Sequence, residues 1–258
     1  MAAQTFTVEC STGSPPILDD WLKHIVNLVA TLICIGFIDQ LSMRRFFPGD
    51  QKTRWFALHF LVNAIICVAA FHDLVHVARR PLCVAIEATA SWAPSYCAWS
   101  LHLYHLLAFT SLRKEDVVHH VLFAGVLGIF NFTINWGRFT NLLIFFMTGL
   151  PGGVDYAMLV LVKTGRIQRI HQKSICSAIN TWIRVPGHVG VASLMASCVK
   201  HGVISAPAWV VSIVASLTLL NGLYYGEQAI GTFHRLAALS PTHKDKTDFA
   251  IAREAVTS

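Results

Sequence analysis

Apolar residues occur in long runs along the 258-residue chain, and short polar segments separate the runs. A helix needs about 20 mostly apolar residues to cross the hydrocarbon core of a bilayer, and several runs reach that length. Glycine and proline mark the joins, as expected where a helix stops and the chain turns back. The pattern predicts helices over residues 22–43, 55–78, 92–112, 116–137, 139–163, 176–199 and 204–233.

We therefore predict an all-α fold, a polytopic transmembrane bundle of about seven helices around a polar, lipid-binding cavity. The composition agrees, because 54% of the residues are hydrophobic and only 13% are charged, too few for the surface of a soluble domain. One transmembrane domain is expected over residues 21–235, between a short N-terminal tail (1–20) and a flexible C-terminal tail (236–258). No basic leader precedes an apolar core in the N-terminal tail, so no cleaved signal peptide is expected.

The formal net charge of +6 comes from short clusters of Lys and Arg between the apolar runs, so nucleic acid is not an expected partner. With the N-terminus outside, 14 of the 20 Lys and Arg residues lie on one side of the membrane and five on the other, and Arg184 lies within the sixth run. Positively charged loops stay cytoplasmic. We predict an outside or lumenal N-terminus and a cytoplasmic C-terminus.

Ionisable side chains lie at membrane depth in several predicted helices. Each costs about 2.5 to 3.5 kcal/mol on insertion scales, so such a residue indicates a functional site by default. In the fourth predicted helix the polar positions fall near multiples of 3.6 residues and form one stripe: Asp116, His120, Asn131, Asn135 and Arg138. We expect this helix to line a cavity along its whole depth.

Other predicted helices add polar residues at similar depth. They are His102 and His105 in the third helix, Asp155 in the fifth, Arg184 and His188 in the sixth, and Asn221, Tyr225 and Gln228 in the seventh. We predict that these faces converge on one interior pocket. Asparagine also holds membrane helices together, so Asn63, Asn180 and Asn221 are interpreted as packing residues.

Asp116 precedes His119 and His120 by about one helical turn. A carboxylate at that spacing holds one ring nitrogen of a histidine and leaves the other as a base or nucleophile. Fixed cations bind a phosphate, a carboxylate or a developing oxyanion, so these parts favour acyl transfer. Asp116, His119 and His120 are the predicted catalytic residues. The predicted substrate-binding residues are His102, His105, Asn135, Arg138, Asp155, Arg184 and His188. No metal site is predicted, and the seven cysteines are expected to be mostly buried thiols.

The run Asp116-Val-Val-His119-His120, followed by Asn135-Trp-Gly-Arg138, resembles the TLC domain shared by translocating-chain-associated proteins, Lag-type ceramide synthases and CLN-type proteins. The likeness extends over roughly residues 50–235. It implies a helical bundle around a lipid-binding cavity in the endoplasmic reticulum membrane. In the synthase branch it implies N-acylation of a sphingoid base from acyl-CoA, with His119 and His120 as the catalytic pair. Ceramide synthases carry a His-Asp pair and a further Asp soon after the arginine, whereas this chain has Met147-Thr148 there and only Asp155 nearby.

Two alternatives to acyl transfer stay open. The first is a noncatalytic protein of lipid binding, lipid trafficking or membrane composition. The second is a di-iron lipid hydroxylase or desaturase, because His72-x-x-x-His76, His102-x-x-His105 and His119-His120 are similar to histidine boxes. The expected ligand is a membrane lipid or acyl chain, with acyl-CoA as co-substrate. No tightly bound cofactor is expected, and self-association stays open.

Overall fold

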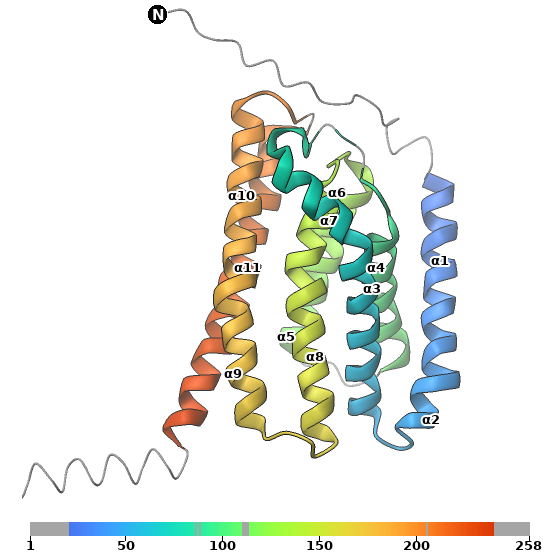
Figure 1. The fold of residues 1–258 in the computed structure, drawn as a ribbon. Coiled ribbons are helices and arrows are strands. Elements are labelled where there is room, and N and C mark those ends of the chain that lie inside the picture. The colour runs from blue at the N-terminus through green and yellow to red at the C-terminus, as the bar shows by residue number, and fades with distance from the viewer. Residues whose placement is uncertain (1–20, 86, 88, 110–113, 205, 240–258) are drawn as a thin grey trace, which may run out of the picture.

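The computed structural model describes residues 21–85, 87, 89–109, 114–204 and 206–239, with only the backbone described for residues 114–116 (Figure 1). No described residue lies in a strand. The elements in chain order are α1 (Trp21–Ile38), η2 (Asp39–Met43), α2 (Arg44–Phe46), α3 (Gln51–Arg79), η3 (Pro81–Cys83), α4 (Ala93–Ala108), α5 (Lys114–His119), η4 (His120–Val126), α6 (Leu127–Thr133), α7 (Phe139–Ile144), η5 (Phe145–Gly149), α8 (Leu150–Lys163), α9 (Arg169–Ile179), η6 (Asn180–Arg184), α10 (Val185–Lys200) and α11 (Ala208–Ala238).

These elements join into seven long helices, so the predicted all-α bundle is confirmed. The first joins α1, η2 and α2; the fourth joins α5, η4 and α6; the fifth joins α7, η5 and α8; the sixth joins α9, η6 and α10. The segments η2, η4, η5 and η6 are π-helical turns within these helices, and η3 is a short 3₁₀ turn. A π turn inside a helix is frequent at functional sites.

Four of the described helices are long and apolar enough to cross a membrane: Trp21–Phe46, Gln51–Arg79, Phe139–Lys163 and Ala208–Ala238. Large apolar side chains on their outer faces are exposed, and Val68 on α3 is 79% exposed. Exposed apolar area of this extent is unusual for a soluble monomer and typical of a surface that faces lipid. The prediction of a membrane protein is therefore confirmed at this level.

The helices run side by side, and the bundle has two ends (Figure 1). α3 contacts α4, α7 and α8, while α11 contacts α9 and α10, and α1 packs at one edge against α4. We call one end the η3 end, because it holds η3 and the turn between α6 and α7. We call the other the basic end, because exposed basic residues gather there: Arg44, Arg45, Lys52, Lys163, Arg166, Arg169 and Arg235.

Asn63 shows how polar side chains hold these helices together. It is fully buried on α3, and its Oδ1 accepts a hydrogen bond of 3.0 Å from Thr148 Oγ1 in η5. A Cβ atom at Gly152 of α8 would lie 2.9 Å from Asn63 Nδ2, so glycine permits this close approach. The predicted packing role of Asn63 is confirmed.

The fourth helix ends at Thr133 rather than at residue 137, so its predicted boundary was wrong. The physical reason lies in the turn that follows. Gly137 has a φ of 55°, a left-handed conformation that favours glycine, and a Cβ there would lie 2.4 Å from the carbonyl oxygen of Val84. The backbone N–H of Arg138 donates to that same oxygen at 2.8 Å. The chain therefore turns against Val84, Ala85 and Glu87 instead of continuing the helix.

Candidate functional site

Four histidines from two neighbouring helices meet inside the half of the bundle nearer the basic end. His102 and His105 lie on α4, His119 ends α5, and His120 begins the π turn η4. The ring centroid of His120 lies 5.2 Å from the centroids of both His102 and His105, and the centroid of His119 lies 5.7 Å from that of His102. The sequence predicted all four as site residues, and the structure brings them together. We call them the histidine cluster.

The cluster continues onto α3 and α8 through aromatic side chains. The rings of Trp55 and His105 have centroids 3.7 Å apart, and those of Trp55 and His59 have centroids 3.3 Å apart. His59 in turn lies against Tyr156, with centroids 4.4 Å apart. His59 is buried, with 7% of its surface exposed. Sequence reasoning missed these three neighbours, although His59 is an ionisable residue in an apolar run, which is the signal that selected the others.

Hydrogen bonds to the backbone define the tautomers of two of these rings. Nδ1 of His102 lies 2.6 Å from the carbonyl oxygen of Ala98, and Nδ1 of His59 lies 3.0 Å from that of Trp55. A carbonyl oxygen only accepts, so each Nδ1 carries the hydrogen and donates it. In the neutral ring, Nε2 then keeps its lone pair. His102 is therefore a base of defined orientation beside His119 and His120.

Tyr225 connects the cluster to α11. Its hydroxyl lies 2.8 Å from Nδ1 of His119, and the guanidinium carbon of Arg184 lies 5.5 Å from the centre of the Tyr225 ring. This contact is a cation–π interaction, which favours the charged guanidinium. Nε of Arg184 is buried and has no hydrogen-bond partner among the described residues. Arg184 therefore offers a buried donor at one edge of the cluster.

Two π turns place these side chains. His120 is the first residue of η4, and Arg184 is the last residue of η6. A π turn holds more residues per turn than an α-helix, so it changes which residues share a face. Asn180 opens η6 and is buried; its Nδ2 donates to the carbonyl of Cys176 at 2.7 Å. The turns thus point polar side chains of two helices toward the bundle interior.

Asp155 lies on α8 in the same half of the bundle and faces α9. Its Oδ1 accepts hydrogen bonds from Gln172 Nε2 at 2.7 Å and from the thiol of Cys176 at 2.8 Å. The carboxylate also interacts electrostatically with Arg184. Asp155 is therefore placed to stabilise the Arg184 cation. His188 follows Arg184 by one helical turn and is 1% exposed. Its Nδ1 donates a hydrogen bond to the Arg184 carbonyl oxygen at 2.7 Å.

A second polar cluster lies near the η3 end and surrounds Asp73, which is fully buried on α3. Oδ1 of Asp73 is ion-paired with Arg138, and its Oδ2 accepts hydrogen bonds from Thr89 at 2.8 Å and from Asn141 at 2.6 Å. Glu87 pairs with Arg138 at 3.3 Å. Glu87 also pairs with His76, which makes one network of two carboxylates, an arginine and a histidine. We call it the Asp73 network.

The Asp73 network and the histidine cluster are separate. His59 and Asp73 are 14 residues apart on the continuous helix α3, which corresponds to about 21 Å. Arg138 is the N-cap of α7 and Asn135 accepts the N–H of Gly137 at 3.0 Å, so neither continues the polar stripe of the fourth helix. The prediction that one stripe carries His120, Asn135 and Arg138 to a shared pocket was wrong. The side chain of Asp116 lies outside the described residues.

No family model, no curated protein and no solved structure matches this chain. The resemblance to the TLC domain therefore stays a prediction. Its two halves now have different surroundings: the paired histidines lie in the histidine cluster, whereas Arg138 lies in the Asp73 network and Asn135 lies in the turn just before it. Asp73 and Glu87, which hold Arg138, were missed from the sequence. A buried carboxylate on a neighbouring apolar helix is the partner that a membrane-embedded arginine requires, so Asp73 was the available signal.

Within the described part of the chain, no group of three His, Cys, Asp or Glu side chains is placed so that it could hold one metal ion. The three predicted histidine boxes are also divided between the two polar clusters. His76 pairs with Glu87 in the Asp73 network, whereas His102, His105, His119 and His120 form the histidine cluster. This arrangement gives the di-iron hypothesis no geometric support.

Proposed function

We propose that the protein is an integral membrane enzyme that transfers an acyl group to a lipid at the histidine cluster. The observation that carries the proposal is the contact between His119, Tyr225 and Arg184, three side chains from three helices, inside an apolar bundle. Placing ionisable groups at this depth is costly, so they favour a reactive site over a packing role.

The histidine cluster supplies a base for such a reaction. His102 keeps a lone pair on Nε2, because its Nδ1 hydrogen is donated to Ala98. The Tyr225 hydroxyl, at 2.8 Å from Nδ1, fixes the ring orientation of His119. A neutral imidazole that is held in this way accepts the proton of an attacking amine or hydroxyl and later returns it to the leaving group. His119 or His120 would act as this general base, with the other rings as neighbours in the cluster.

Arg184 supplies the positive charge that acyl transfer needs. When the nucleophile attacks a thioester, the carbonyl oxygen becomes an oxyanion, and a fixed cation in a site of low dielectric stabilises it. The unpaired Nε of Arg184 and the electrostatic support from Asp155 suit this role. The Lys and Arg residues of the basic end would attract an anionic donor such as acyl-CoA toward the same half of the bundle. A sphingoid base is the acceptor that the TLC resemblance suggests.

The orientation proposed from the sequence places the basic end in the cytoplasm and the η3 end outside or in the lumen of the endoplasmic reticulum. Exposed basic residues at the basic end support it. Cys83 of η3 is disulfide-bonded, and structural disulfides form in oxidising compartments such as the lumen. Among the other cysteines that the structure describes, Cys34, Cys67, Cys97, Cys176 and Cys198 are free thiols. The orientation predicts that Lys200→Cys, at an exposed position of the η3 end, is labelled by a membrane-impermeant maleimide added from the lumenal side.

Acyl transfer can be tested with the purified full-length protein in phosphatidylcholine vesicles. Palmitoyl-CoA is the donor, sphinganine and diacylglycerol are offered as acceptors, and mass spectrometry measures the acylated products. We expect turnover with one acceptor and a loss of about 10²-fold or more in His119→Ala and His120→Ala. His171→Ala, an exposed histidine at the basic end, is the matched control and should keep its activity. Lipid that copurifies without turnover would overturn acyl transfer in favour of noncatalytic lipid binding.

A further inference from the structure

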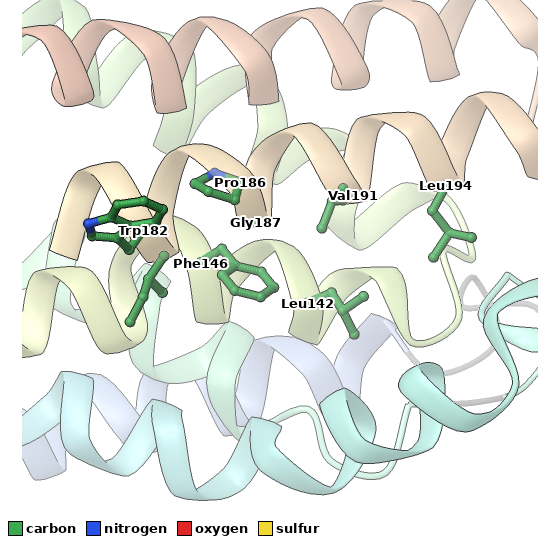
Figure 2. Close-up of a pocket in the computed structure, with 9 residues that line it drawn as sticks. Leu142, Phe146, Trp182, Pro186, Gly187, Val191 and Leu194 are labelled. Atoms are coloured by element: carbon green, nitrogen blue, oxygen red, sulfur yellow. The ribbon is translucent and has the colours of Figure 1, made fainter. Parts of the chain in front are cut away.

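An apolar groove of about 460 Å³ opens on the surface of the bundle between the fifth and sixth helices (Figure 2). Its walls are formed by two residues of α7 and η5 and by seven residues of η6 and α10: Leu142, Phe146, Trp182, Ile183, Pro186, Gly187, Gly190, Val191 and Leu194. Leu142 and Val191 are buried at its floor, and Trp182 at its rim is 78% exposed. No charged side chain lines this groove.

Two glycines on α10 shape the groove. A Cβ at Gly187 would lie 2.2 Å from a ring carbon of Phe146, so glycine lets that ring lie against the helix backbone. A Cβ at Gly190 would meet nothing within 4 Å. Gly190 therefore leaves a gap that a side chain would fill without a clash. A gap of this kind at membrane depth is filled by hydrocarbon, because an apolar surface gains nothing from water.

The groove has the length of one leaflet. Trp182 and Leu194 are 12 residues apart on one helix, which corresponds to about 18 Å along the axis. The hydrocarbon core is about 30 Å thick, so one leaflet contributes about 15 Å. The groove runs from the middle of the sixth helix toward the η3 end, where exposed Lys200 closes α10. Lys200 follows Leu194, the last groove residue, by six residues, so it lies about 9 Å further toward the η3 end, at the level of lipid head groups.

We propose that this groove is a binding site for one acyl chain of a phospholipid in the leaflet at the η3 end. Its apolar lining matches the chain, its length matches the leaflet, and its η3 end lies about 9 Å short of exposed Lys200, which is at head-group level. The site differs from the ordinary lipid-facing surface because the chain lies between two helices. The inference rests on the membrane-embedded bundle and not on the histidine chemistry, so the two fail independently.

The site can be tested with the full-length protein in phosphatidylcholine vesicles that contain a phosphatidylcholine with a diazirine in its acyl chain. After irradiation, mass spectrometry maps the modified residues. We expect adducts to concentrate on Trp182, Leu194 and their groove neighbours. Val68 on α3, which is equally exposed at 79%, reports contact with bulk lipid. Equal labelling of Val68 and Trp182 would overturn the proposal.

A pair of glycine substitutions makes the test specific. Gly190→Leu fills the groove, and we expect a several-fold loss of adducts on the groove residues. Gly231→Leu on α11 is the matched control, because a Cβ there also meets nothing within 4 Å and the position is outside the groove. Thermal unfolding of both variants checks that the bundle is intact. Unchanged groove labelling in folded Gly190→Leu, or an equal loss in Gly231→Leu, would contradict the assignment.

Discussion

The Tyr225 hydroxyl on α11 lies 2.8 Å from Nδ1 of His119 on α5, although the two residues are 106 positions apart in the sequence. This contact joins the last helix of the bundle to the histidine cluster. Arg184 of η6 lies over the same tyrosine ring. The ring of Tyr225 is thus the meeting point of the base and the cation on which the proposed acyl transfer depends.

Removing the hydroxyl of Tyr225 tests whether it positions His119. In Tyr225→Phe the ring and its contact with Arg184 remain, but the hydrogen bond to Nδ1 is lost. We expect the rate of acyl transfer to fall by about 10-fold. General base catalysis raises a rate by about 10² to 10⁴-fold, and a misoriented base loses part of that factor. The pH at which the rate is half-maximal should shift as well. Tyr224→Phe, the exposed neighbouring tyrosine, is the control. An unchanged rate and pH profile in Tyr225→Phe would remove the positioning role.

Breaking the Asp73 network should affect stability rather than chemistry. Arg138→Met leaves the fully buried carboxylate of Asp73 without its cation, and the loss of one partner of a buried pair costs about 3 to 5 kcal/mol. Unfolding of the detergent-solubilised protein measures the difference. Exposed Arg79→Ala at the same end should stay within about 0.5 kcal/mol of wild type. If Arg138→Met leaves the free energy of unfolding unchanged but abolishes turnover, Arg138 belongs to the active site instead.

Gly128 of α6 lies against the indole ring of Trp99 on α4. A Cβ there would lie 1.0 Å from a ring carbon of Trp99, so Gly128→Ala requires the indole or the helix to move. Overpacking of this kind costs about 1 to 3 kcal/mol or more. Gly125→Ala in η4 is the control, because its nearest contact would be an ordinary 3.7 Å. Equal unfolding temperatures for the two variants would show that the fourth helix is not packed as described.

Asp50 caps the N-terminus of α3 outside the membrane-spanning segment. It accepts hydrogen bonds from the Thr53 hydroxyl at 2.5 Å and from the Thr53 backbone N–H at 3.0 Å, and the hydroxyl contact is the main reason that the pKa of this carboxyl lies below its ordinary value. Because the folded pKa is lowered, the stabilisation is complete above the unfolded value of about 3.9 and is lost as pH falls through the folded pKa.

Asp50→Ala should therefore destabilise the protein by about 1 kcal/mol at neutral pH, the usual value of an N-cap. The difference from wild type should shrink below a pH of about 4. Asp50→Asn keeps a capping side chain and should lose much less at neutral pH. Denaturant unfolding at several pH values measures all three proteins. A constant difference between wild type and Asp50→Ala across the acid range would contradict the cap.

Hydrophobic run length predicted the helices well, because spanning length and apolar composition are written directly in the sequence. The contents of the site were harder to predict. Periodicity placed Asn135 and Arg138 on the same helix face as His120. In the structure, Gly137 turns the chain and four π turns change which residues share a helix face. Neither the turn nor the π turns leave a mark on the pattern of hydrophobic residues. His102, His105, His119 and His120 were brought together as predicted. The partners Asp73 and Glu87 come from distant segments and could not be paired by spacing.

The division between the two polar clusters is the claim that a single comparison tests best. His120 and His76 are both histidines of the bundle, but His120 belongs to the histidine cluster and His76 to the Asp73 network. The measurement is the rate of acyl transfer from palmitoyl-CoA per mole of folded protein for His120→Ala and His76→Ala. We predict a loss of about 10²-fold or more in His120→Ala and little change in His76→Ala. Equal rates in both variants, or a greater loss in His76→Ala, would contradict it.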